Sequence, residues 1–207
     1  MSVTTQPPPI PAAADAAIPT VPIYRLTVAQ YQAMADQGIL TEDDPVELLE
    51  GWLVQKMTKH RPHSLVTLLI RQALERLLPV GWYVDSQEPI ATTDSQPEPD
   101  VFVVRGEPRD FQDRQPGPEE VVLVIEVADT TLQTDRDAKQ RVYARSGIPV
   151  YWIANLSESR FEVFADPSGP TEQPHYRQRR EYGPGDEIPV MLAGTDAGSI
   201  PVQSLLP

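Results

Sequence analysis

The sequence predicts a mixed α/β domain in which helices flank a central β-sheet. Residues 63–78, "HSLVTLLIRQALERLL", repeat apolar side chains at helical spacing. Residues 101–104 and 120–128 are β-branched runs that look buried on both faces. Residues 132–147 return to a helical pattern and are followed by a further strand at 150–156. Helices and strands thus mix without the regular βαβ repeat of a doubly wound fold.

The clearest helix is the one over residues 63–78. Its apolar face is formed by residues spaced three and four apart, namely Val66, Leu69, Ile70, Ala73, Leu74 and Leu77. A shorter helix is expected over residues 28–37, where Thr27 and Gln30 resemble a capping box and Gly38 ends the helix. The third helix, 132–147, should end at Gly147.

The remaining strands are predicted from short apolar runs bounded by turn residues. Residues 46–57 contain two such runs around Glu50-Gly51 and predict a β-hairpin. Residues 82–91 predict one strand, and residues 160–166 and 175–182 predict a terminal hairpin. Strands and helices together give a central mixed sheet with helices beside it.

Length and composition restrict the class of protein. A chain of 207 residues is long enough for one core, so we expect a single domain over residues 23–207, preceded by a disordered Pro/Ala-rich tail over residues 1–22. The absence of cysteine excludes disulfides, thiolate metal sites and cysteine nucleophiles. No apolar run approaches the roughly 20 residues that span a bilayer, so we expect a soluble, cytoplasmic protein. The net charge of −13 argues against a broadly basic surface for nucleic acid.

Two acidic residues stand where strands should be buried. Asp100 begins one strand, and Glu126 lies within the run "VVLVIEV", where an isolated charge would be costly. The link between these strands has too little helical pattern for a crossover, which favours antiparallel neighbours. A register that places Val104 opposite Val122 also places Asp100 opposite Glu126. Two carboxylates that meet in this way need either a shared proton or a cation, and an oxygen-loving ion such as Mg²⁺ or Mn²⁺ suits them.

Lys139 is the third candidate. It shares one helical stripe with Asp135, Val142 and Tyr143, and this stripe should face the sheet. A lysine near two acids can orient or deprotonate a water, or stabilise a developing anion. The alternative is an exposed ion pair with Asp135 one helical turn away.

The spacing of these residues resembles the Uma-two family, whose members are described as restriction endonucleases. The resemblance is carried by "PEPDVFVV", "VVLVIEVADTTLQTDRDAKQRVYARSGIPVYWIANL" and, upstream, "VELLEGWLVQKM" and "RPHSLVTLLIRQAL". It extends over most of residues 24–190. The family is similar to the PD-(D/E)XK nucleases, which implies a restriction-endonuclease-like fold with a central mixed sheet flanked by helices.

The resemblance also implies roles for individual residues. Asp100, Glu126 and the backbone carbonyl of Val127 would be metal ligands, and Lys139 would be the catalytic lysine. The sequence departs from the superfamily pattern at Ala128, where a lysine usually stands. The resemblance implies that this lysine has moved to the following helix.

Upstream residues could complete the site. Glu50 and Glu47 occupy positions where related nucleases often place an additional acid, although acidic residues beside glycine also suit turns. His63, at the start of a helix, is the other candidate, as a ligand or base or simply as a helix-start side chain.

Three functions can be considered for these residues. The first is a Mg²⁺- or Mn²⁺-dependent endonuclease that hydrolyses DNA and is expected to act as a homodimer, and the acidic net charge is the main objection to it. The second is an inactive nuclease-fold protein that serves as an oligomeric interaction module, with Tyr151, Trp152 and Phe164 in a symmetric interface. A glycoside hydrolase with two carboxylates is disfavoured, because Lys139 and the apolar surroundings do not suit a sugar.

Overall fold

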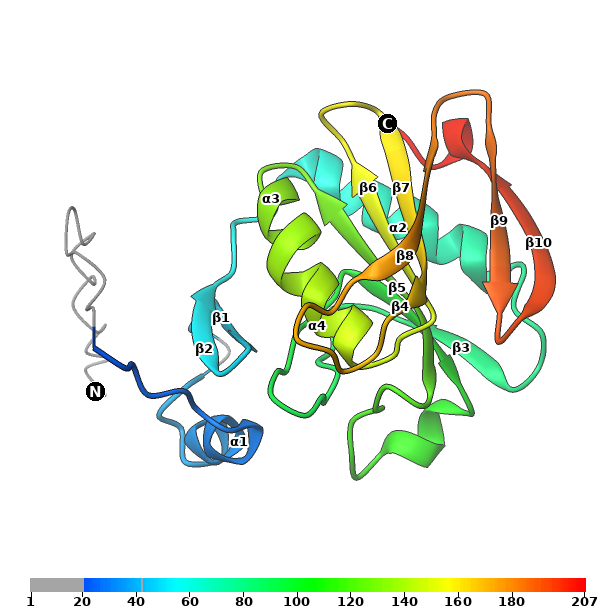
Figure 1. The fold of residues 1–207 in the computed structure, drawn as a ribbon. Coiled ribbons are helices and arrows are strands. Elements are labelled where there is room, and N and C mark those ends of the chain that lie inside the picture. Colours follow the sequence, from blue (N-terminus) through cyan, green and yellow to red (C-terminus); the bar gives the residue numbers. More distant parts are fainter. Residues whose placement is uncertain (1–20, 42) are drawn as a thin grey trace, which may run out of the picture.

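The computed structural model describes residues 21–41 and 43–207 (Figure 1). The tail predicted over residues 1–22 lies, through residue 20, outside the described residues. The N-terminal elements are α1 (Val28–Asp36), β1 (Val46–Leu49), β2 (Trp52–Gln55) and α2 (Arg61–Glu75). They are followed by β3 (Trp82–Asp85), β4 (Val101–Arg105), β5 (Val121–Ala128), α3 (Leu132–Thr134), a π-helical turn (Asp135–Lys139) and α4 (Gln140–Arg145). The C-terminal strands are β6 (Val150–Asn155), β7 (Arg160–Pro167), β8 (Tyr176–Tyr182), β9 (Glu187–Leu192) and β10 (Thr195–Pro201), and two short 3₁₀ helices occur at Pro108–Phe111 and Val202–Ser204.

The central sheet has six strands in the order β3-β4-β5-β6-β7-β8. Strands β5 and β6 are parallel, and the other neighbours pair antiparallel. A parallel pair needs a crossover connection, and the helical segment from α3 to α4 provides it. The predicted mixed sheet flanked by helices is therefore confirmed.

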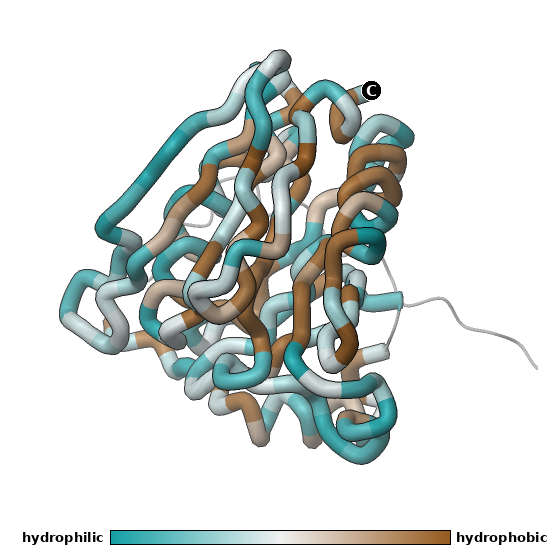
Figure 2. The backbone as a smooth tube through the Cα atoms, turned by 90° about the vertical axis from the view of Figure 1, so that its right-hand side faces the viewer, coloured by the Kyte–Doolittle hydropathy of each residue, from teal (hydrophilic) through white to brown (hydrophobic). Residues whose placement is uncertain are grey.

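Helices cover both faces of this sheet. Helix α2 packs one face, where its residues Val66 and Ile70 join Val103 and Ile125 in one core. The segment from α3 to α4 covers the opposite face and forms a second core (Figure 1). Brown, hydrophobic colour runs along the central strands between these layers (Figure 2). None of the helices described here is long and apolar enough to cross a membrane.

The hairpin of β9 and β10 was not predicted. Strand β9 buries every second residue, Ile188, Val190 and Leu192, and adds them to the core on the α2 side. The sequence contains this alternation, but Pro189 and the nearby glycines are residues that argue against a strand. The hairpin lies beside the central sheet in Figure 1.

The aromatic residues that were considered for a dimer interface belong to the interior. Tyr151 and Trp152 are completely or almost completely buried, and Phe164 retains only 4% exposure. Tyr151 and Phe164 stack within the α4-side core, whereas Trp152 packs edge-on against Phe161. The proposed interface through these side chains is thus wrong, because the monomer itself covers them.

The register of β4 and β5 differs from the prediction in one detail. A register shift between Val103 and Val104 places Val104 opposite Val121, so the predicted pairing with Val122 is wrong. This shift lies at the end of β4 that is distant from Asp100, so it does not alter the pairing near the two acidic residues. Val101 pairs with Ile125, and the next position along this register brings Asp100 beside Glu126.

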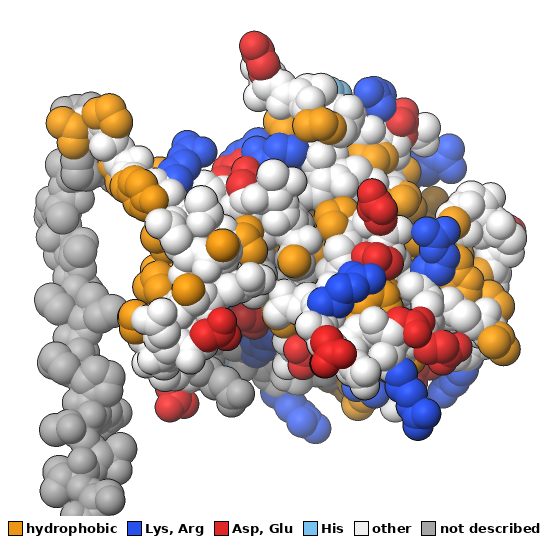
Figure 3. All heavy atoms as spheres, turned by 90° about the horizontal axis from the view of Figure 1, so that it is seen from below, with side chains coloured by type: hydrophobic (Ala, Val, Ile, Leu, Met, Phe, Trp, Pro, Cys, Tyr) orange, Lys and Arg blue, Asp and Glu red, His pale blue; other side chains and the backbone are white. Residues whose placement is uncertain are grey.

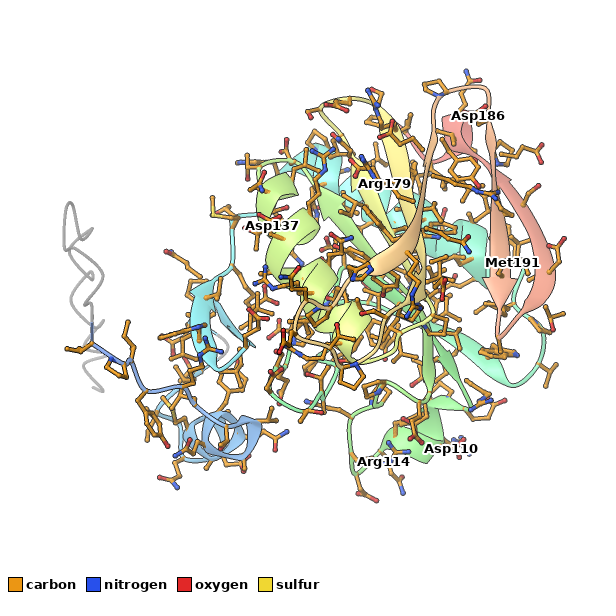
Figure 4. All side chains as sticks on the ribbon, in the orientation of Figure 1. Asp110, Arg114, Asp137, Arg179, Asp186 and Met191 are labelled. Carbon is orange, nitrogen blue, oxygen red and sulfur yellow. The ribbon has the colours of Figure 1, made fainter. Side chains whose placement is uncertain are left out.

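The predicted helix over residues 132–147 is interrupted by the π-helical turn. Asp135 and Lys139 begin and end this turn, and both are buried. Asp137, labelled in Figure 4, marks the exposed side of the same turn. Single π-turns within helices occur frequently at functional sites. The helical segment ends before Gly147, whose φ of +77° suits a C-terminal glycine.

The hairpin of β1 and β2 forms a small sheet of its own. Its turn residues, Glu50 and Gly51, both have positive φ, as a two-residue turn of type I′ requires. A Cβ on Gly51 would lie 2.6 Å from the Cβ of Arg25, so this position also needs glycine for space. Gln96 N–H donates to the carbonyl of Leu48 at 2.7 Å and attaches the hairpin to the loop that leads to β4.

Candidate active site

A cavity of about 590 Å³ opens where β5 ends. Its walls come from the β1–β2 hairpin, the segment 56–63, and the chain from Glu126 to Lys139. The cavity brings together residues from distant parts of the sequence, namely Glu47, Lys59, His63, Asp100, Glu126, Val127, Asp135 and Lys139. It therefore contains Asp100, Glu126, Lys139, His63 and Val127 of the predicted site, but Glu50 is not among its lining residues.

Asp100 is buried and held by three groups. Its Oδ1 lies 3.1 Å from Lys59 Nζ, and its Oδ2 lies 3.0 Å from His63 Nε2. The N–H of Val127 donates to Oδ2 at 2.9 Å. Burial alone would raise the pKa of Asp100, but His63, Lys59 and this N–H hold the pKa below its usual range. Asp100 is therefore a carboxylate.

The proline before Asp100 explains why a carboxylate begins this strand. Continuing the β4–β5 register places Val127 opposite Pro99, which has no N–H to donate. Leu156 N–H donates to the carbonyl of Ala128, so Ala128 faces β6 and the N–H and C=O of Val127 face β4. Asp100 accepts the N–H of Val127 in place of a backbone partner. The Val127 carbonyl is left on the same edge without a ladder donor from Pro99.

Glu126 lies on the α4 side of β5. Its Oε1 accepts hydrogen bonds from Lys139 Nζ at 2.9 Å and from the Tyr143 hydroxyl at 2.7 Å. Burial is the largest influence on Glu126 and raises its pKa, the acids Asp135, Asp100 and Glu47 also raise it, and Lys139 lowers it. The resulting pKa is about 8. The ammonium group of Lys139 thus does not offset the effect of burial on Glu126.

Lys139 is buried among acids and does not form the exposed ion pair considered as the alternative. Its Nζ lies 2.9 Å from Glu126 Oε1 and 3.4 Å from Glu47 Oε1. Burial would lower the pKa of Lys139, but Glu126, Glu47 and Asp135 raise it well above the ordinary value. Lys139 is therefore a fixed ammonium group at the centre of the cluster.

The hairpin contributes Glu47 and not Glu50. The Oε2 of Glu47 accepts the N–H of Glu98 at 3.1 Å, while its Oε1 faces Lys139. Glu50 lies at the turn and pairs instead with Arg141 at 2.7 Å and Arg145 at 3.1 Å. Hydrogen bonding to Arg141 lowers the pKa of Glu50 in spite of partial burial. The prediction that placed Glu50 in the site is corrected, because this side chain attaches the hairpin to α4.

Two residues of the cavity were not singled out from the sequence. Asp135 is buried, accepts a hydrogen bond from the Thr131 hydroxyl at 2.6 Å, and burial raises its pKa to about 6. Its position on the Lys139 stripe was recognised, but its role as a lining acid was not. Lys59 could have been noticed because the sequence around it contains no acidic residue.

The donor set fits a hard divalent cation. Four carboxyl groups, those of Glu47, Asp100, Glu126 and Asp135, line the cavity, and hard divalent cations prefer such oxygen ligands. Within the described residues, no three His, Cys, Asp or Glu side chains gather closely enough to hold an ion by themselves. A cation would thus depend on Asp100, Glu126 and a backbone carbonyl, with water completing the shell.

The structure thus joins a mixed sheet flanked by helices to a cavity of acidic and basic side chains at the end of β5. The family model Uma2, "Putative restriction endonuclease", matches residues 28–199, and the chain belongs to this family. This finding confirms the resemblance seen in the sequence. A search of curated proteins finds no match.

A solved structure supports the fold independently. The crystal structure of "a putative nuclease belonging to DUF820" from Anabaena variabilis ATCC 29413 is similar, with a TM-score of 0.64 and 16% sequence identity. The match covers 87% of this chain and 97% of that chain. At this level of identity the likeness shows a shared fold.

Proposed function

We propose that this protein is a metal-dependent endonuclease that hydrolyses phosphodiester bonds of DNA at the Asp100–Glu126–Lys139 cavity. The observation that carries the proposal is the position of Lys139 Nζ, 2.9 Å from the Glu126 carboxylate at the end of the strand that faces Asp100. Membership of the Uma2 family supports the same reaction class.

The ligands would be the carboxylates of Asp100 and Glu126 and the carbonyl of Val127, with Mg²⁺ or Mn²⁺ as the ion. When bound, the ion would polarise the scissile phosphate and make water more acidic. His63 and the N–H of Val127 orient Asp100. The Tyr143 hydroxyl orients Glu126.

Lys139 would neutralise the charge that develops on the phosphate. An ammonium group held by buried carboxyl groups is pre-positioned, so little reorganisation is needed during the reaction. Ala128 stands where related nucleases usually have a lysine. Lys139, at the end of the π-helical turn, supplies an ammonium group to Glu126 instead. The sequence does not determine the distance between Lys139 and Glu126, and the 2.9 Å separation of Nζ and Oε1 favours an active site.

A nicking assay on supercoiled plasmid tests the reaction. Wild type should nick DNA in Mg²⁺ or Mn²⁺ and not in EDTA, and Lys139→Met should reduce the rate by roughly 10²–10³-fold. Calorimetry should show specific Mg²⁺ binding by wild type and none by Asp100→Asn. Arg71→Gln, on the exposed side of α2, is the matched surface control.

The same assay addresses the inactive-module alternative. Specific metal binding without any nicking by folded wild-type protein would contradict the endonuclease proposal. The homodimer and the cytoplasmic location remain predictions, and sedimentation analysis of the full chain tests the first of them.

A further inference from the structure

One wall of the cavity is formed by a segment of the chain that has basic residues and no acidic ones. No Asp or Glu occurs from Gly51 to Leu74, although the chain contains 30 acidic residues among 207. The same stretch holds Lys56, Lys59, Arg61 and Arg71 and two of the three histidines. In the face shown in Figure 3, by contrast, acidic and basic side chains are interspersed.

The structure places this basic stretch at the cavity wall. Residues 56–60 connect β2 to α2 without regular secondary structure, and all of them line the cavity. Lys56, Lys59 and Lys139, which are the only lysines of the chain, all line it. Arg61 follows at the first position of α2, is exposed, and forms no ion pair with any described residue.

Lys59 is more exposed than Lys139. The Lys59 side chain is 39% exposed, whereas the Lys139 side chain is 10% exposed. Lys59 Nζ nevertheless lies 3.1 Å from Asp100 Oδ1, an oxygen of the carboxylate that would bind the metal. The ammonium group of Lys59 and a divalent ion therefore compete for the same oxygen.

We propose that Lys59 is a mobile counter-charge that neutralises Asp100 when no divalent ion is bound and turns outward to bind a DNA phosphate when an ion occupies the site. Its flexible stem and partial exposure allow both positions. Arg61 lies in the same basic segment and supplies a second phosphate contact. The inference rests on the proposed function, whose substrate contacts it names.

This arrangement couples metal and DNA. An ion that displaces Lys59 releases a cation toward the substrate, so metal binding strengthens DNA binding, and by linkage DNA strengthens metal binding to the same degree. The coupling also provides a local source of DNA affinity in a protein whose net charge is −13.

The first test measures Mg²⁺ binding by calorimetry without DNA. Because an exposed ion pair contributes about 0.2–1 kcal/mol, Lys59→Gln should bind Mg²⁺ about 1.5- to 5-fold more tightly than wild type. Lys59→Arg retains the charge and should behave as wild type. Arg180→Gln on β8, whose residues do not line the cavity, is the matched control and should also leave the affinity unchanged. Unchanged or weaker Mg²⁺ binding by folded Lys59→Gln would overturn the proposal.

The second test measures binding of a labelled DNA duplex by fluorescence anisotropy at several salt concentrations, in EDTA and in Ca²⁺. In Ca²⁺, which prefers the same oxygen ligands, Lys59→Gln should reduce the slope of log K against log salt by about 1. In EDTA the slope should not change, because Lys59 is then held by Asp100. An equal reduction in both conditions, or none in Ca²⁺, would contradict the switch.

The outcomes separate this inference from the proposed function. If wild type nicks plasmid but Lys59→Gln changes neither metal nor DNA binding, the role of Lys59 is refuted and the endonuclease stands. If Lys59→Gln gives both expected shifts while wild type does not nick, the counter-charge is supported and the catalytic proposal fails. If wild type binds no duplex in either condition, both are refuted.

Discussion

The pH dependence of stability should report the burial of the Glu126 carboxyl group. Burial gives this carboxyl a pKa of about 8, against an ordinary value of 4.5. Between these two pKa values the native state holds a proton that the unfolded chain has released, so stability decreases as pH rises toward the native pKa and levels off above it. With these two pKa values, the free energy of unfolding of metal-free protein should fall by about 2 kcal/mol between about pH 6 and about pH 8.

Neighbouring groups contribute little within this range. The pKa of Asp135 is about 6, so its loss of stability is largely complete where the range begins. The pKa of Asp100 is lowered and that of Lys139 is raised. Asp100 therefore changes stability at acidic pH and Lys139 in strong base, both outside the range from about pH 6 to about pH 8. These three groups therefore do not account for a decline in this range, and Glu126 does.

Urea unfolding in EDTA at several pH values provides the assay. Glu126→Gln has no carboxyl to titrate, so its unfolding free energy should be nearly constant over the range in which that of wild type falls. Glu75→Gln, which removes an exposed acid of α2, should follow the wild-type curve. Parallel curves for wild type and Glu126→Gln would refute the reasoning. Added Mg²⁺ should flatten the wild-type decline, because an ion stabilises the ionised carboxylate.

Three further substitutions test the geometry. Gly51→Ala should destabilise the protein by more than about 1 kcal/mol in urea unfolding, because φ is +80° and the new Cβ would meet Arg25; wild-type stability would contradict the turn. Tyr143→Phe removes the hydrogen bond to Glu126 and should cost about 1–2 kcal/mol, measured in the same way, and an unchanged midpoint would argue against the contact. Glu50→Gln should leave calorimetric Mg²⁺ affinity within about 2-fold of wild type, since this residue lies outside the cavity; a large loss would return it to the site.

Local patterns in the sequence determine much of the site. The apolar run around Glu126 requires a buried strand, and a carboxylate there requires a positive partner. Helical periodicity places Lys139 on the stripe that faces the sheet, and the structure confirms that it meets Glu126 at 2.9 Å. The loop before β5 is too poor in helix for a crossover, which makes β4 antiparallel and brings Asp100 to the same end. Each inference depends on residues within one element or between adjacent strands.

Contacts between distant elements are determined by the tertiary structure. Glu47 and Glu50 are three residues apart in one hairpin, and only the packing of that hairpin against the loop before β4 and against α4 directs the first to Lys139 and the second to Arg141. The contact between Lys59 and Asp100 likewise joins segments with no shared periodicity. Periodicity specifies which face of an element is buried, whereas long-range packing specifies which residues meet there.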